Sequence, residues 1–350
     1  MNRRHFITTA AALPWAIAGC AHRSPLASAR WSQLAPLPNP LGVAAPFAGV
    51  SGNSLLVAGG ANFPDGLPWE GGKKVWHDTV YRLDAPTGSW SIAGKLQRPL
   101  AYGVSVTTPD GLICIGGSDA TRHYPGAFRL FLRGDSLRVE PLPPLPKSLA
   151  NAAGALVGQQ ILLCGGSTEP GERSASNQLW SLDLSHLTAG WRELPALPAE
   201  PRFLATAASD GRDFYLFGGV ALTKRDDNFA RVYLKDAWRF RASTGWQRLV
   251  DLPRPLAAAP SPAPVIGNEI ALLPGDDGSL AGFQPVSKHP GFPRRSLIYD
   301  IQLKQWRDGG KVPFALVTTP CVRWQQRLVV PGGEVRPGVR SPNIWSIALT

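Results

Sequence analysis

Two side chains of opposite charge near the end of the sequence have the types and spacing of a catalytic pair. Glu334 directly follows a glycine pair, and Arg340 lies six positions later, beyond a Pro337-Gly338 turn that can fold the two side chains toward one point. A carboxylate can take a proton from a substrate and return it, and a planar guanidinium suits an anionic ligand. The same spacing also suits an ion pair that only stabilises a loop. The elements that position the pair must therefore be considered.

An apolar run that ends on glycine occurs six times and predicts a repeat. The first glycines of these runs lie 57, 49, 53, 57 and 57 residues apart, and in the fifth copy (residues 272–276, LLPGD) the second glycine is replaced by an aspartate. A strand of small residues precedes each run, a further strand follows a variable loop, and tryptophan strands end the units at Trp90, Trp191, Trp246 and Trp306. Four short strands at a period near fifty resemble the kelch repeat, which forms one blade of a β-propeller.

The two ends of the sequence predict how the propeller closes. The sixth unit stops at Leu349 and Thr350 without a tryptophan strand, and residues 30–34 (RWSQL) supply one. We therefore expect an all-β, six-bladed kelch-type propeller over residues 30–350, whose last blade is closed by the N-terminal strand so that no sheet edge stays open. The blades are expected to form a single domain.

Other polar residues occupy the loops expected at the mouth of the channel. Arg98 and Arg202 each lie in a loop that enters an inner strand, and Asn62 follows the first glycine pair. We expect these three to bind substrate hydroxyls or charges, although Asn62 equally suits a turn cap. His289 lies in the long loop 277–295, which we expect to act as a partial lid.

The first residues are interpreted as an export signal and not as part of the fold. Residues 2–7 (NRRHFI) resemble a twin-arginine signal, and the following apolar stretch ends in IAGC, which resembles a bacterial lipobox with Cys20 as the lipidated residue. The predicted organisation is a signal over 1–19, a tether over 20–29 and the propeller over 30–350. We expect a periplasmic lipoprotein that contacts the membrane only through the lipid on Cys20.

Charge and cysteine content narrow the class of partner. Removal of Arg3 and Arg4 with the signal lowers the formal charge from +11 to +9, and the remaining basic residues are scattered without interleaved aromatic residues. A nucleic-acid partner is therefore not expected, whereas acidic substrates are. Cys114, Cys164 and Cys321 each lie in an apolar strand, which predicts buried free thiols and no disulfide framework or metal site.

Residues 333–340 (GEVRPGVR) resemble a segment of the bacterial sialic acid mutarotases, the N-acetylneuraminate epimerases, which are six-bladed kelch proteins of the periplasm. Residues 47–50 (FAGV), 59–61 (GGA) and Arg98 with 101–105 (AYGVS) are also similar, and the resemblance extends from about residue 31 to 350. The order of the segments is circularly shifted relative to those enzymes and matches a cyclically permuted branch, of which 62–69 (NFPDGLPW) and 289–294 (HPGFPR) are typical.

This resemblance implies a cofactor-independent isomerase that interconverts the anomers of N-acetylneuraminate or a related acidic sugar. Glu334 would be the general base and acid that opens the ring, and Arg340 would bind the substrate carboxylate. Arg98, Arg202, Asn62 and Tyr102 would be further substrate-binding residues. No cofactor and no metal are implied.

Two other classes remain open from the sequence. A non-catalytic kelch propeller that binds carbohydrate or protein at the cell envelope would not need Glu334 and Arg340 together at the mouth of the channel. A copper radical oxidase of the galactose oxidase type also has kelch blades. It requires two histidines, two tyrosines and a cysteine cross-linked to one tyrosine, and the few histidines and strand-buried cysteines here disfavour it.

Overall fold

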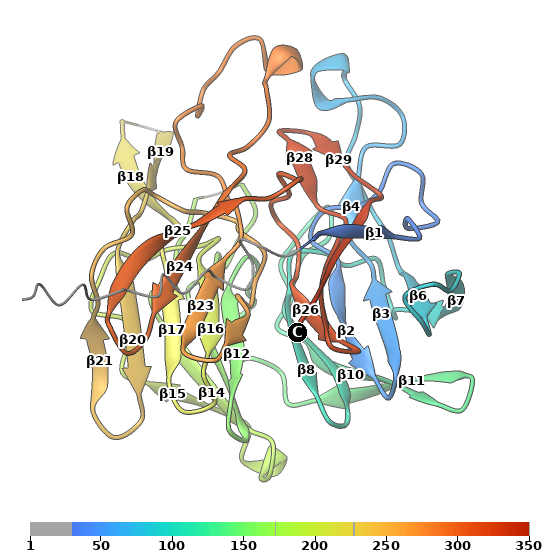
Figure 1. Cartoon of the computed structure of the whole chain (residues 1–350), viewed down its shortest axis with the longest axis horizontal. Coiled ribbons are helices and arrows are strands. Elements are labelled where there is room, and N and C mark those ends of the chain that lie inside the picture. The colour runs from blue at the N-terminus through green and yellow to red at the C-terminus, as the bar shows by residue number, and fades with distance from the viewer. Residues whose placement is uncertain (1–29, 172, 227, 350) are drawn as a thin grey trace, which may run out of the picture.

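The computed structural model describes residues 30–171, 173–226 and 228–349. These residues form six four-stranded antiparallel sheets, each of which is one blade of a propeller (Figure 1). The predicted signal, the tether and Cys20 lie outside the described residues. The described part of the chain contains no helix long and apolar enough to cross a membrane.

Five blades are formed by consecutive strands, listed from the innermost outward. The first is β2 (Phe47–Ser51), β3 (Ser54–Ala58), β6 (Thr79–Leu83) and β7 (Ser91–Lys95). The second is β8 (Val104–Thr108), β9 (Gly111–Ile115), β10 (Ala127–Arg133) and β11 (Ser136–Leu142). The third is β12 (Ala153–Val157), β13 (Gln160–Cys164), β14 (Leu179–Asp183) and β15 (Trp191–Leu194). The fourth is β16 (Thr206–Ser209), β17 (Phe214–Phe217), β20 (Ala237–Arg241) and β21 (Gly245–Arg248). The fifth is β22 (Val265–Ile266), β23 (Glu269–Leu272), β24 (Arg295–Asp300) and β25 (Gln305–Lys311).

The sixth blade is made from both ends of the described chain. Its strands are β26 (Val322–Trp324), β27 (Arg327–Pro331) and β30 (Ile344–Ala348), followed at the outer edge by β1 (Ser32–Leu34). Ser32 pairs with Ser346 and Leu34 with Ile344, so the first strand completes the last blade as predicted (Figure 1). This pairing closes the ring of blades.

The hydrophobic core consists of six layers, and each layer lies between two neighbouring blades. In β3, Leu55 and Val57 pack against the sixth blade, whereas Leu56 and Ala58 pack against the second. Successive side chains of a strand point to opposite faces of its sheet, and neighbouring blades cover both faces near the axis, so a second strand such as β9 (GLICI) is buried at every position. Cys114, Cys164 and Cys321 are buried and unpaired among the described residues, as predicted. Burial raises the pKa of the Cys164 thiol to about 12.

Tryptophans on the outer strands connect blades through hydrogen bonds. The indole N–H groups of Trp90, Trp191, Trp246 and Trp306 donate to the backbone carbonyls of Ala35, Pro143, Pro195 and Val250 at 2.8, 2.8, 2.8 and 2.9 Å. Each acceptor lies just beyond the outer strand of the preceding blade. The second blade has an outer strand, β11, although it lacks the tryptophan that marked this strand elsewhere.

Three two-stranded hairpins and a long loop extend from one side of the propeller. The hairpins pair β4 (Ala61–Asn62) with β5 (Val75–Trp76), β18 (Val220–Arg225) with β19 (Asn228–Tyr233), and β28 (Glu334–Arg336) with β29 (Val339–Arg340). The 3-10 helices η1 (Pro68–Glu70) and η3 (Val286–Lys288) lie in the loops on this side, and η2 (Leu187–Ala189) precedes β15. The long loop between β23 and β24 and the β28–β29 hairpin both lie in the upper part of Figure 1.

A closed ring of six backbone hydrogen bonds surrounds the propeller axis at the entry to the innermost strands. Each amide N–H in this ring donates to the carbonyl of the equivalent residue in the preceding blade, at 2.7 to 3.1 Å. The ring residues are Ala45, Tyr102, Asn151, Leu204, Ala258 and Thr318. All six have positive φ, between 51° and 65°, a conformation that non-glycine residues adopt only where their surroundings impose it. The ring therefore fixes the backbone from which side chains project toward the mouth of the channel.

Candidate functional site

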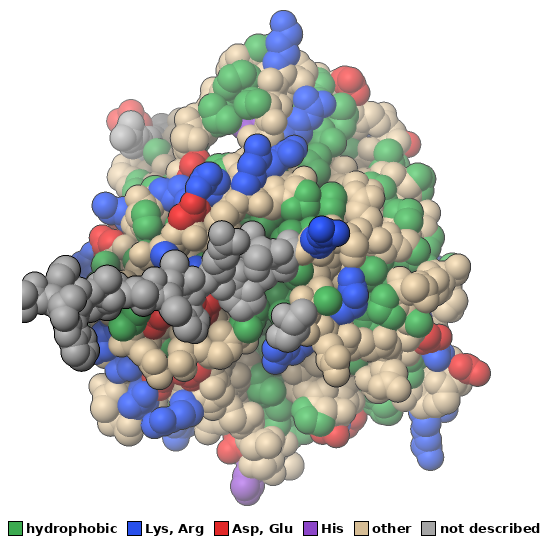
Figure 2. All heavy atoms as spheres, viewed as in Figure 1, with side chains coloured by type: hydrophobic (Ala, Val, Ile, Leu, Met, Phe, Trp, Pro, Cys, Tyr) green, Lys and Arg blue, Asp and Glu red, His purple; other side chains and the backbone are tan. Residues whose placement is uncertain are grey.

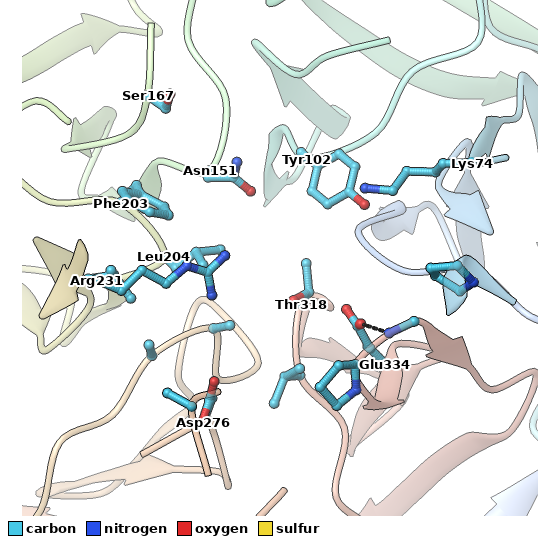
Figure 3. A pocket seen from close by; sticks show the side chains of 18 of the residues that line it. Lys74, Tyr102, Asn151, Ser167, Phe203, Leu204, Arg231, Asp276, Thr318 and Glu334 are labelled. Atoms are coloured by element: carbon cyan, nitrogen blue, oxygen red, sulfur yellow. Dashed lines mark hydrogen bonds between the residues drawn. The ribbon is translucent and has the colours of Figure 1, made fainter. Parts of the chain in front are cut away.

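A cavity of about 750 Å³ lies at the mouth of the central channel, a volume typical of small-ligand sites. All six blades contribute to its lining, through residues that include Lys74, Tyr102, Asn151, Arg231, Asp276 and Glu334 (Figure 3). Figure 2 shows an opening in the surface near the long loop, with Lys and Arg side chains gathered close to it. A second cavity of about 70 Å³ lies deeper in the channel, beside the starts of the inner strands. Five of the six ring residues line both cavities.

The position after the last glycine of each repeat is structurally equivalent in all six blades. Each of these residues forms a bridge to the residue that precedes the ring residue of its blade; they are Ala61, Ser118, Ser167, Val220, Asp276 and Glu334. The sequence alignment of the fifth unit is therefore wrong by one residue. Gly275 is equivalent to the second glycine of the other copies, and Asp276 is equivalent to Glu334 and not to a glycine. The cavity consequently carries two carboxylates at equivalent positions of neighbouring blades.

Glu334 and Arg340 form an ion pair inside the cavity. They face each other across the β28–β29 hairpin, and the Arg340 Nη1 donates to the Glu334 Oε1 at 3.2 Å. The Gly338 amide donates to the same oxygen at 2.7 Å, and Gly338 has φ 81°, which the turn requires. Both predicted residues line the cavity, and the ion pair that their spacing also suited is present.

The two members of this pair differ in their access to a ligand. The Arg340 side chain is 4% exposed and the Glu334 side chain is 18% exposed. The Arg340 guanidinium lies over the Phe63 ring, with Cζ 4.7 Å from the centroid, and its Nε donates to the Ala61 carbonyl at 3.4 Å. Arg340 therefore holds the Glu334 carboxylate in place, and Glu334 presents its more accessible side chain to the cavity.

A lysine surrounded by aromatic rings lies on the same side of the cavity. The Lys74 Nζ is 5.8 Å from the centroid of Phe63, 5.5 Å from that of Trp76 and 5.2 Å from that of Tyr102. Lys74, its three ring neighbours and Arg340 all line the cavity, and Figure 3 shows the Lys74 ammonium directed at Tyr102. Tyr102, predicted to bind substrate, thus lines the cavity as expected.

The second carboxylate has a tyrosine partner. The Tyr233 hydroxyl donates to the Asp276 Oδ2 at 2.8 Å, and the Gly278 amide donates to Oδ1 at 3.0 Å. Burial and the negative charge of Asp276 raise the pKa of Tyr233, which keeps its hydroxyl protonated at neutral pH. Arg231 lies close by, with Nη1 3.5 Å from the Tyr233 hydroxyl (Figure 3). Asp276 and Tyr233 form a hydrogen-bonded proton-carrying pair on the rim.

The long loop after Asp276 covers part of the cavity. Phe283, His289 and Phe292 line it, and the His289 ring lies 5.5 Å from the Phe283 ring and 5.9 Å from the Phe292 ring. The Gly291 amide donates to the His289 Nδ1 at 3.0 Å. The Arg336 guanidinium connects the β28–β29 hairpin to this loop by donating to the Ser287 carbonyl at 2.8 Å. The loop thus lines the mouth of the channel, and its action as a partial lid stays a prediction.

Arg202, predicted to bind substrate, is instead a buried structural residue. Its side chain is 1% exposed and donates two hydrogen bonds to Asp236, at 2.6 and 2.8 Å. It also donates to the carbonyls of Gly218 and Glu200, at 3.0 and 3.1 Å. The side chain therefore turns away from the cavity into the space between strands, where its donors satisfy a carboxylate and two carbonyls.

Asn62 is likewise outside the cavity lining. It is 1% exposed, and its Nδ2 donates to the Gly42 carbonyl at 2.8 Å and to the Asn39 Oδ1 at 3.2 Å. Its Oδ1 lies 2.8 Å from the His77 Nε2, which donates to it. Burial lowers the pKa of His77, against a smaller opposing effect of Asp78. Asn62 therefore links its hairpin to a neighbouring loop, which is neither the predicted contact with substrate nor the predicted cap of its own turn.

Arg98 also points elsewhere. It is exposed and stacks on the Tyr124 ring, with Cζ 4.6 Å from the centroid. It is not among the residues that line the cavity. Of the six predicted catalytic and substrate-binding residues, the structure brings together Glu334, Arg340 and Tyr102.

Sequence reasoning missed Lys74, Asp276 and Tyr233. A signal for Asp276 was present, because it follows the repeat glycine as Glu334 does, but the one-residue misalignment hid it. Lys74 and Tyr233 lie in loops and hairpins of variable length, where the repeat does not show which residues of different blades are equivalent. Among the described residues, no group of three or more His, Cys, Asp or Glu side chains is placed to hold a metal ion.

Comparison with known proteins identifies related chains. A family model described as N-acetylneuraminate epimerase matches residues 23–139 and 142–284. The N-acetylneuraminate epimerase of Yersinia pestis (strain Pestoides F) is 30% identical over 232 residues, which cover 59% of this chain and 57% of the relative. That of Brucella suis (strain ATCC 23445 / NCTC 10510) is 41% identical over 130 residues, 32% of this chain and 33% of the relative. The match thus spans little more than half the length of the first relative.

Among solved structures, one titled "Structure of YjhT" is similar over 90% of this chain and 97% of its own, with a TM-score of 0.66 and 14% sequence identity. At this identity the likeness supports the propeller fold. The family match ends at residue 284, before the β28–β29 hairpin that carries Glu334 and Arg340.

Proposed function

Since the chain belongs to the N-acetylneuraminate epimerase family, we propose that it is a cofactor-independent mutarotase that interconverts the anomers of N-acetylneuraminate or a related acidic sugar. The observation that carries the proposal is the placement of Glu334, held by Arg340 and the Gly338 amide, in the cavity at the mouth of the channel. The circular shift of segments supports assignment to the cyclically permuted branch.

The reaction requires one proton to leave the substrate and one to reach it. Glu334 takes the proton of the anomeric hydroxyl, the bond between the anomeric carbon and the ring oxygen breaks, and a carbonyl group forms as Glu334 delivers that proton to the ring oxygen. Rotation about the bond next to the carbonyl carbon exposes its other face. Reclosure reverses the proton transfers, and Glu334 returns its proton to the new anomeric hydroxyl. General acid–base catalysis of this kind contributes about 10²–10⁴-fold.

The geometry favours different roles for the two members of the ion pair. Arg340 is nearly buried and already engages Glu334 and the Ala61 carbonyl, so it is a positioning residue for Glu334 and is poorly placed to bind the substrate carboxylate. The Tyr233 hydroxyl donates its proton to Asp276, so the Tyr233 oxygen can accept a hydrogen bond from a substrate hydroxyl and the pair is a second proton acceptor of the cavity.

The same observation bears on the alternative of a non-catalytic binding propeller. In that class the acid and the guanidinium would pair with each other away from the channel. Here they pair with each other but line the cavity together, which favours a catalytic role.

The experiment that tests the proposal is proton NMR of freshly dissolved α-N-acetylneuraminate, with purified wild type, Glu334→Gln and no protein. We expect wild type to accelerate the appearance of the β-anomer, and Glu334→Gln to lose about 10²–10⁴-fold of that acceleration. Glu193→Gln, on the exposed face of β15, is the matched control and should retain it. A folded wild type that does not exceed the spontaneous rate would remove this reaction.

Export and anchoring remain part of the proposal. We propose that the twin-arginine sequence directs the folded protein to the periplasm and that Cys20 carries the lipid. The support is the NRRHFI segment and the IAGC lipobox. Cys20→Ala should move the protein from the membrane fraction to the soluble periplasmic fraction, and an unchanged membrane fraction would contradict the anchor.

A further inference from the structure

Lys74 is a cavity cation whose surroundings differ from those of the other cations there. Its ammonium lies within 6 Å of three aromatic centroids, those of Phe63, Trp76 and Tyr102, which stabilises it on one side through cation–π attraction. Within the described part of the chain, no Asp or Glu oxygen lies within 4.0 Å of its Nζ. The rings remove water from the ammonium but do not neutralise its charge.

The other two cavity cations are engaged in protein contacts. Arg340 pairs with Glu334 at 3.2 Å, and Arg231 contacts the Tyr233 hydroxyl at 3.5 Å, beside Asp276. Lys74 thus faces the cavity with donors available and with a partly desolvated charge, which makes its attraction for an anion stronger than that of a fully hydrated surface lysine.

The position of Lys74 beside the Glu334–Arg340 pair is a second reason to expect that it binds an anionic group of the ligand. Lys74 and Arg340 both lie over the Phe63 ring, at 5.8 and 4.7 Å from its centroid, so Lys74 is a close neighbour of the Glu334–Arg340 pair. In a 2-keto acid sugar the carboxylate is bonded to the anomeric carbon. The group that binds this carboxylate must therefore lie next to the group that takes the proton of the anomeric hydroxyl, which we place at Glu334.

We infer that Lys74, in its box of Phe63, Trp76 and Tyr102, is the binding site for the carboxylate of the sugar substrate. This inference rests on the proposed function for the identity of the ligand class, an acidic monosaccharide. It assigns to Lys74 the role that the sequence suggested for Arg340. Lys74 contributes to affinity and to the selection of acidic over neutral sugars, while proton transfer remains with Glu334.

The test compares N-acetylneuraminate with its methyl ester, which lacks the negative charge and is larger by one methyl group. Dissociation constants are measured by calorimetry, and kcat and KM by NMR, for wild type, Lys74→Met and Lys74→Arg. Lys74→Met keeps the aliphatic stem against the rings and removes the charge. Lys73→Met, at the exposed neighbouring position, removes the same charge from the surface and is the matched control.

We expect wild type to bind the acid more tightly than the ester. Lys74→Met should raise Kd and KM for the acid about 10–100-fold, the loss expected for one hydrogen bond to a charged group, and leave kcat within about threefold. Binding of the ester should hardly change, so the preference for the acid disappears. Lys74→Arg should restore part of the preference, and Lys73→Met should behave as wild type.

The inference is overturned if Lys74→Met keeps the preference for the acid, if wild type binds acid and ester equally, or if it binds neither. Its failure differs from that of the proposed function. A wild type that binds N-acetylneuraminate without accelerating anomer exchange refutes the mutarotase. The Kd values of Lys74→Met then still decide the carboxylate site.

Discussion

Replacement of Arg202 by methionine provides a test of the correction made at this residue. The sequence placed Arg202 among substrate-binding residues, whereas in the structure it is 1% exposed and joined to Asp236 by two hydrogen bonds. Methionine fills much of the same volume but leaves the half-buried Asp236 carboxylate without its cation. The Trp238 indole N–H, which donates to Asp236 at 2.6 Å, would be its remaining side-chain partner.

The expected cost follows from that geometry. Removing one member of a buried ion pair typically costs about 3–5 kcal/mol, because the remaining charge stays desolvated. With an unfolding entropy of about 2.1 cal/mol/K per residue, a propeller of about 320 residues should lose about 4–8 °C in Tm. The assay is differential scanning calorimetry at pH 7.5, with the proposed mutarotation measured at 20 °C, where the folded variant should match wild type.

The pH dependence of the Tm difference between wild type and Arg202→Met gives a second test of the Arg202–Asp236 pair. Burial alone would raise the pKa of Asp236, but the hydrogen bonds and charge of Arg202 outweigh it and hold the pKa below 3.8. In wild type this carboxylate therefore contributes stability above pH 3.8 that is lost as pH falls through the lowered pKa. In Arg202→Met no cation opposes the effect of burial on the Asp236 pKa, so protonation of Asp236 removes the buried unpaired charge from the variant. The Tm difference should shrink toward acid pH.

Two results would refute this reasoning. A folded Arg202→Met with a Tm within about 2 °C of wild type would show that the pair contributes little to stability. A variant with unchanged Tm and a raised KM would return Arg202 to the ligand site. The double variant Arg202→Met/Asp236→Leu is the control, because removing both charges should recover most of the loss.

Three further predictions concern other parts of the molecule. Asp276→Asn, which removes the charge beside Tyr233, should lower kcat about 10- to 100-fold at unchanged Tm. Anomer exchange rates measured by NMR check this, and a kcat equal to that of wild type would exclude Asp276 from proton transfer. Burial lowers the pKa of His77 in the folded state, so the neutral imidazole contributes stability above pH 6.5 that is lost as pH falls. His77→Gln should therefore make the fall in Tm between pH 7.5 and 5, measured by calorimetry, less steep. A fall as steep as that of wild type would contradict this. Trp191→Phe removes the 2.8 Å hydrogen bond to Pro143 between blades and should destabilise the protein by about 1–2 kcal/mol in urea unfolding, whereas a midpoint equal to that of wild type would show that this bond is dispensable.

The fold could be predicted because its determinants repeat along the chain. In five of the six blades both glycines after the second strand have positive φ, as at Gly59 (67°) and Gly60 (91°), so this backbone conformation makes the glycines recur. The tryptophans recur because each donates to a neighbouring blade. Even the pairing of Ser32 with Ser346 follows from counting, since the sixth unit lacked one strand.

The site was only partly predictable, for a physical reason that Arg202 and Lys74 illustrate. The sequence shows which residues enter a loop but not the direction of their side chains. The Arg202 side chain turns inward to Asp236, 34 residues away in sequence, whereas the Lys74 ammonium lies near the Tyr102 ring of the neighbouring blade. Glu334 and Arg340 were found because both lie in a single short hairpin, and a register shift between Glu334 and Arg336 places the two residues opposite each other.

The ring of hydrogen bonds around the axis has a consequence for how such a protein acquires new ligands. The six ring residues keep their positive φ through main-chain N–H and C=O groups, so the shape of the cavity floor does not depend on which side chains they carry. Ala45, Tyr102, Asn151, Leu204, Ala258 and Thr318 already range from small to aromatic and from apolar to amide. Substitutions at the five of these positions that line the larger cavity can therefore change the chemistry offered to a ligand while the backbone beneath it stays in place.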